Sequence, residues 1–136
     1  MQKLRAKTQT TTGRKILDFT VESLEAAAPY ELGASKANDF VGTTMFPVYV
    51  RGEAYLASRQ GSKAAAEFQK ILDHRGLVLN RPIGALAHLG RGRAYVLQGD
   101  TVKAKAAYQD FLKLWKNADP DIPVLRQAKA EYARLQ

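Results

Sequence analysis

The stretch RGEAYLASRQGSKAAAEF at residues 51–68 returns forty residues later as RGRAYVLQGDTVKAKAAY at residues 91–108. Four positions carry the repeated pattern of small and aromatic side chains: Gly52, Tyr55, Ala64 and Phe68 correspond to Gly92, Tyr95, Ala104 and Tyr108. Self-similarity at a fixed spacing indicates a repeat architecture and outweighs local propensities. We therefore expect two copies of one supersecondary unit in this chain.

The spacing inside each copy predicts a pair of antiparallel helices. Gly52 and Tyr55 lie three residues apart and share one helix face, and Ala64 and Phe68, four apart, share another. A glycine inside a helix costs about 1 kcal/mol relative to alanine, so its use at the same phase in both copies needs a packing reason. We expect Gly52 to face Ala64, with the same contact in the second copy, so that the paired helices approach closely.

The rest of the chain divides around these two copies. Helices are expected at about 45–60, 62–74, 82–98 and 100–116, with Ser62 and Asp100 as the N-caps of the second helix in each pair. Pro29 ends an earlier amphipathic stretch, since proline cannot continue a helix. The predicted organisation is a basic, frayed segment at 1–13 and a helical domain at 14–136, with a half repeat at 14–29, repeats at 45–74 and 82–116, and a terminal helix at 121–136.

The pattern of small and aromatic residues resembles the helix–turn–helix signature of tetratricopeptide repeats over most of the chain. The resemblance implies an all-α fold: an α-solenoid of antiparallel helix hairpins with about 2.5 repeats and a C-terminal capping helix, because each hairpin alone leaves an apolar face exposed. Two features depart from the family pattern. The period is 40 residues rather than roughly 34, and Arg59 stands where the second copy has the turn glycine Gly99.

Three short segments, at 29–33, 70–76 and 119–123, resemble the C-terminal repeat tails of certain bacterial multidomain proteins. In those proteins the repeats follow a eukaryotic-like serine/threonine kinase domain or a winged-helix regulatory domain. The resemblance implies that this chain is the docking portion of a larger signalling protein. The absence of cysteine is typical of a reducing, cytoplasmic setting, and no apolar run approaches the roughly 20 residues of a membrane span.

In tetratricopeptide proteins the first helix of each repeat lines a concave surface, so the resemblance places a peptide-binding groove there. The exposed groove positions that follow from the repeat phase are Tyr49, Glu53, Leu56 and Ala57 in the first copy and Leu89, Arg93, Val96 and Leu97 in the second. Their mixture of apolar and charged side chains predicts a protein or peptide ligand in an extended or helical form. The alternative is that another part of a parent protein covers this groove.

No arrangement of residues predicts catalysis, a cofactor or a metal site. The two histidines, His74 and His88, are fourteen residues apart, and neither has a second ligand at the spacing of a zinc motif. His74 stands near a helix end, where it is expected to interact with terminal carbonyl groups. Gly90-Arg91-Gly92 lacks the preceding strand of a phosphate-binding loop, so packing explains its glycines. We therefore expect a non-catalytic protein.

The formal net charge is +8, so the partner is expected to be acidic. Electrostatic binding of a polyanion or nucleic acid is an alternative, although the aromatic residues occupy packing positions rather than a stacking surface. A purely structural or oligomerisation role is a further alternative. The helix at 14–28 lacks a complete partner, so a second copy of the chain is expected to cover its face of Leu17, Val21 and Leu24 in a homodimer.

Overall fold

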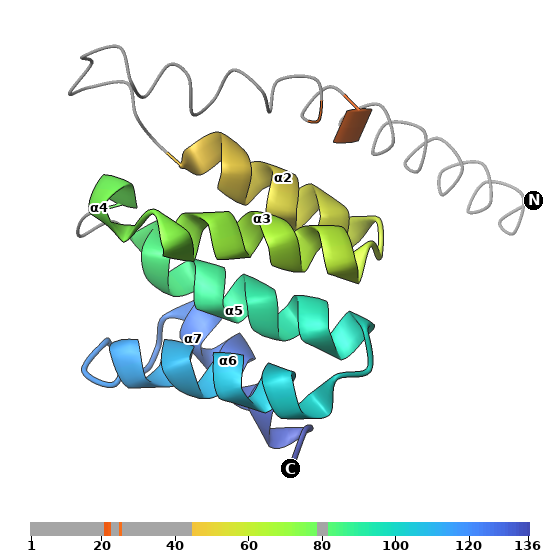
Figure 1. Cartoon of the computed structure of the whole chain (residues 1–136). Helices are drawn as coiled ribbons and strands as arrows, with labels where there is room; N and C mark the ends of the chain where they lie inside the picture. Colours follow the sequence, from red (N-terminus) through yellow and green to blue (C-terminus); the bar gives the residue numbers. More distant parts are fainter. Residues whose placement is uncertain (1–20, 23–24, 26–44, 79–81) are drawn as a thin grey trace, which may run out of the picture.

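The computed structural model describes residues 21–22, 25, 45–78 and 82–136 (Figure 1). Within these ranges the chain is helical and contains no strand, which confirms the predicted all-α class for them. The helices are α2 (Phe46–Ala57), α3 (Gly61–Asp73), α4 (Arg75–Val78), α5 (Pro82–Leu97), α6 (Thr101–Leu114) and α7 (Pro123–Ala133). The four helices expected in the two copies begin within one residue, and end within three residues, of the predicted positions.

The turns between paired helices share one backbone shape although their sequences differ. Gly99, between α5 and α6, has φ +75°, and Arg59, at the equivalent position between α2 and α3, has φ +60°. Both values lie in the left-handed region, which costs a residue with a Cβ roughly 1–2 kcal/mol and is open to glycine. The departure at Arg59 therefore raises the energy of the turn without changing its form.

The N-caps differ between the two copies. Asp100 caps α6 as predicted, because its Oδ1 accepts a hydrogen bond from the backbone N–H of Lys103 at 3.0 Å. In the first copy the prediction of Ser62 as the cap is wrong. Helix α3 already begins at Gly61, and Gln60 occupies the cap position without a side-chain hydrogen bond to the helix. Ser62 is an exposed residue inside the first turn of α3.

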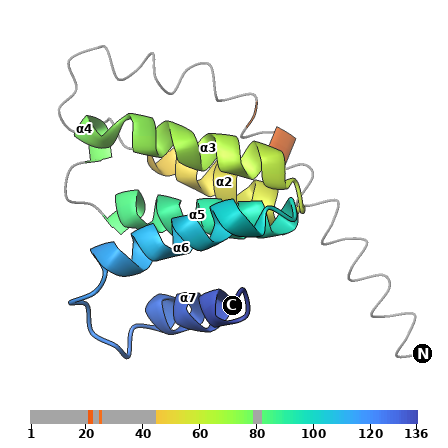
Figure 2. The same cartoon turned by 60° about the horizontal axis from the view of Figure 1, so that its bottom comes forward.

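Helix packing continues from one pair to the next. Helix α2 lies antiparallel to α3, and α5 lies antiparallel to α6 (Figure 1). Helix α3 packs against α5 as extensively as the helices within each pair pack against each other. Helix α7 contacts α6 and lies below the α5–α6 pair in the turned view of Figure 2.

Phe68 is the buried ring on which α2, α3 and α5 meet. A Cβ added to Gly52 of α2 would lie 2.8 Å from Cε1 of Phe68, and one added to Gly90 of α5 would lie 2.5 Å from Cζ. The atoms nearest to Gly52 thus belong to the Phe68 ring, and not to Ala64, the residue expected to face it. Gly90 has no glycine counterpart in the first copy. The close approach of the same ring is the reason that glycine is needed at this position.

The second core cluster joins α5, α6 and α7. Its buried members are Leu89, Tyr108, Phe111, Leu125 and Ala128. The atoms nearest to Gly92 belong to the ring of Tyr108, since an added Cβ would lie 2.9 Å from Cδ2 of the tyrosine. Both repeated glycines thus let the last aromatic residue of the signature touch the backbone of the preceding helix.

Several predictions fall outside the described ranges, namely the segment at 1–13, most of the half repeat at 14–29, and the residues Leu17 and Leu24. Val21 is described and is 6% exposed, in the same buried cluster as Val48 and Tyr55. The single chain already covers Val21, and the homodimer expected through this face stays a prediction, because Leu17 and Leu24 lie outside the described residues. Among the described helices, none has both the length and the apolar character that a membrane crossing requires.

Candidate binding surface

The C-terminal ends of α2, α5 and α7 converge on a cavity of about 360 Å³. Four of the eight predicted groove residues line it: Leu56 from α2, and Arg93, Val96 and Leu97 from α5. The remaining lining residues are Tyr108 of α6 with Glu131, Arg134 and Leu135 at the end of the chain. We call this the groove cavity. Leu56 and Val96, which are forty positions apart in the sequence, thus line the same cavity.

The other four predicted groove residues do not line this cavity. Leu89 is 1% exposed, so its prediction as an exposed groove position is wrong. Its side chain belongs to the core cluster that α7 completes. The prediction transferred the exposed phase of α2 to α5 and did not include the cover that α7 provides. Tyr49 and Glu53 are half-buried on α2, and Ala57 is exposed at its end. Burial, together with the neighbouring charge of Glu53, raises the pKa of Tyr49 to about 12.

Glu131 is the centre of the polar contacts at the groove cavity. Arg93 donates from Nε and from Nη2 to its two carboxylate oxygens, each at 2.9 Å, and the Tyr108 hydroxyl donates to Oε2 at 2.6 Å. Burial alone would raise the pKa of Glu131, but the hydrogen bonds from Arg93 and Tyr108 outweigh it and hold the pKa below its ordinary value. Burial and the bond to Glu131 raise the pKa of Tyr108. Arg93 is therefore already paired within the chain.

The apolar part of the groove cavity is open to a ligand. Val96 is 44% exposed, whereas Leu56, Leu97 and Leu135 are half-buried around it. Arg134 is exposed, and its side chain forms no ion pair with any residue in the described ranges. An apolar wall beside an exposed cation, whose charge also acts on Glu131, can accept an apolar side chain and a neighbouring carboxylate.

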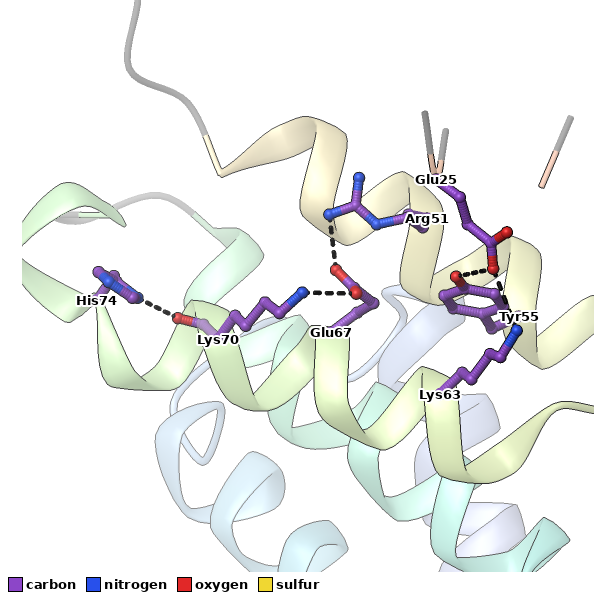
Figure 3. A network of polar contacts seen from close by, with 7 residues as sticks. All are labelled: Glu25, Arg51, Tyr55, Lys63, Glu67, Lys70 and His74. Carbon is purple, nitrogen blue, oxygen red and sulfur yellow. Dashed lines mark hydrogen bonds and ion pairs between the residues drawn. The ribbon is translucent and has the colours of Figure 1, made fainter. Parts of the chain in front are cut away.

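A separate polar network joins α2 to α3 (Figure 3). Arg51, which is 1% exposed, donates to Oε2 of Glu67 at 2.7 Å, and Lys70 donates to Oε1 of the same carboxylate at 2.8 Å. At the other end of the network, Glu25 accepts from the Tyr55 hydroxyl at 2.5 Å and from Lys63 at 3.1 Å. Both groups of contacts link helices to one another, so the network is structural.

Neither histidine belongs to a metal site in the described part of the chain. His74 contacts the backbone carbonyl of Lys70 through Nδ1 at 2.7 Å, which agrees with its predicted place at a helix end. His88 is buried, with Nδ1 3.7 Å from a carboxylate oxygen of Asp110. Burial lowers the pKa of His88 more than Asp110 raises it. No group of three histidine or acidic residues in the described ranges could hold a metal ion.

Sequence reasoning missed the contribution of α7 to the groove cavity. The sequence predicts the terminal segment only as a capping helix, and the predicted groove residues include neither Glu131 nor Arg134. The repeat period does not point to these residues, since adding forty to the groove positions 93 and 96 gives Ala133 and Gln136, neither of which lines the cavity. Glu131 could not have been found this way, because its role depends on the position of α7 against Arg93.

No protein-family model, curated protein or solved structure matches this chain. The functional argument therefore depends on the geometry, burial and charges described above.

Proposed function

We propose that this chain is a tetratricopeptide-like α-solenoid module that binds a peptide or protein segment on its concave face, without catalysis. The observation that supports the proposal is the convergence of Leu56, Arg93, Val96 and Leu97 on one cavity. The face continues from the end of α2 across α5 to the end of α7. A bacterial signalling protein in the cytoplasm is the setting that the sequence resemblance suggests.

The chemistry of the groove cavity narrows the expected ligand. Val96, Leu97 and Leu135 can surround one apolar side chain, which is the usual anchor of a peptide in a pocket. Arg93 is already paired with Glu131, so an acidic group of the ligand contacts Arg134 instead. The net charge of +8 favours the approach of such an acidic segment. The preferred ligand therefore has an aliphatic or aromatic residue next to aspartate or glutamate.

Selection from a random peptide library tests this proposal with a matched pair of variants. Val96 and Val102 are both exposed valines, but only Val96 lines the groove cavity. Peptides selected on the wild-type chain are expected to share an apolar anchor with a neighbouring acid. Val96→Glu is expected to weaken them at least about tenfold, because it places a charge in the apolar pocket and repels the acid. Val102→Glu makes the same change in charge on α6 and is expected to leave their affinity unchanged.

Three results would argue against a groove-directed peptide ligand. The first is that no peptide is enriched, and the second is that the two valine variants weaken the selected peptides equally. The third is binding of random-sequence DNA that falls steeply with salt and is the same in wild type and Val96→Glu, which would favour the polyanion alternative.

A further inference from the structure

A second and larger cavity, of about 590 Å³, is lined by residues from the end of α3, from α4, from the start of α5 and from the end of α6. Its apolar lining includes Ile71, Leu72 and Trp115, and its polar lining residues are Arg75 and His88. None of these residues lines the groove cavity. We call it the α4 cavity. Its volume and mainly apolar walls are those of small-molecule sites in proteins.

The charged groups around the α4 cavity favour an anion. Arg75 is exposed and forms no hydrogen bond or ion pair with any residue of the described ranges. Gly84 and Ala85 line the cavity at the start of α5, where the first N–H groups of a sixteen-residue helix have no intrahelical acceptor and carry partial positive charge. No carboxylate is among the described residues that line it. One part of the wall is therefore positive, and the rest is apolar.

His88 is a buried titratable residue in the wall of the α4 cavity. The residue is 9% exposed, and its Nδ1 forms no hydrogen bond in the described part of the chain but lies 3.7 Å from a carboxylate oxygen of Asp110. The charged groups that act on the ring are Asp110 of α6, Arg91 of α5 and Arg75 of α4. Burial lowers the pKa of His88, Asp110 opposes this, and both arginines add to it. An anion beside Arg75 would offset those two positive charges and raise the pKa of His88.

We propose that the α4 cavity binds a small amphipathic carboxylate, with its apolar body against Ile71, Leu72 and Trp115 and its carboxylate on Arg75 at the start of α5. The site is separate from the groove cavity, so it does not depend on the proposed peptide function. A carboxylate suits Arg75 because the guanidinium can donate two parallel hydrogen bonds to it. The buried edge of His88 responds to the ligand through its protonation and need not touch it.

Trp115 is the only tryptophan of the chain, so its fluorescence reports directly on this cavity. Decanoate is the probe, titrated below its micelle concentration, and decanol is the neutral ligand of matched length. Decanoate is expected to change the Trp115 emission in a saturable way and to bind at least about tenfold more tightly than decanol. In parallel, NMR titration of His88 is expected to show that its pKa rises when decanoate is bound.

Variants separate recognition by Arg75 from general attraction to a basic protein. Arg75→Met is expected to weaken decanoate about tenfold, whereas Arg126→Met, which removes one exposed charge on α7, is expected to leave it unchanged. Val96→Glu is also expected to bind decanoate normally, which distinguishes this site from the groove cavity. The circular dichroism of each variant shows that it has folded.

The proposal is overturned by any of three results. The first is an unchanged Trp115 emission across the decanoate titration. The second is equal affinity for decanoate and decanol. The third is an equal weakening of decanoate by Arg75→Met and Arg126→Met.

Discussion

Replacing Gly90 with alanine tests whether the ring of Phe68 is held against the backbones of two helices. The new Cβ would lie 2.5 Å from Cζ and 2.6 Å from both Cε atoms of the ring. Phe68 is fully buried, and Gly52 of α2 approaches the same ring to 2.8 Å, so the ring has little room to move. The alanine therefore forces helices α3 and α5 apart or distorts the ring position.

The expected cost can be worked out from two opposing effects. Overpacking a core typically costs about 1–3 kcal/mol, and for a contact as short as this one we expect a cost near the upper end, about 3 kcal/mol. The better helix propensity of alanine offsets about 1 kcal/mol of it. Gly90→Ala is thus expected to lower the free energy of unfolding by about 2 kcal/mol, which for a chain of this size lowers Tm by roughly 6–8 °C.

Urea unfolding followed by far-UV circular dichroism measures this loss. Gly76→Ala is the matched control, since a Cβ at Gly76 meets no atom within 4 Å, and it is expected to be as stable as wild type or slightly more so. In a Phe68→Leu background, the added methyl of Gly90→Ala finds space, and its cost is expected to fall by more than half. The reasoning is refuted if Gly90→Ala matches the wild-type stability, or if its cost is the same in both backgrounds.

Four further changes test other contacts by urea unfolding. Glu67→Ala removes a carboxylate partner of the buried Arg51 and is expected to lower the free energy of unfolding by about 3 kcal/mol. Arg59→Gly removes the left-handed strain and is expected to raise it by about 1 kcal/mol. The pKa of Glu131 is lowered in the folded state, so the ionised carboxylate stabilises the fold above pH 4.5, and this stabilisation is lost as the pH falls through the folded pKa. Glu131→Gln is therefore expected to lose less stability on acidification than wild type. The pKa of His88 is also lowered, so wild type is expected to lose stability as the pH falls below 6.5, and His88→Phe to lose less.

The helices of the two repeated copies could be predicted because their signals are local. Gly99 and Asp100 mark a turn and a cap by their own conformational preferences, and Pro82 opens α5 at its first position. Arg59 shows the limit of such signals. Its side chain gives no sign of the left-handed backbone that the pairing of α2 with α3 imposes on it.

The contacts between helix pairs could not be predicted in the same way. Gly90 and Phe68 are far apart in sequence, and their contact depends on how α3 docks on α5. Leu89 occupies the phase of a groove residue, yet α7 completes the core around it. Leu56, Arg93 and Val96, which the repeat phase places at groove positions, all line one cavity, and their role in binding stays a prediction.

The extensive packing of α3 on α5 has a consequence for folding. In an array of repeats, stability is the sum of the intrinsic stability of each unit and the coupling between neighbours. Here the surface between the two helix pairs is as extensive as the surfaces within them, so the coupling is large. The two pairs are therefore expected to unfold in one cooperative transition, with similar hydrogen-exchange protection in α3 and α5, and a fragment that ends before α5 is expected to lack a stable fold of its own.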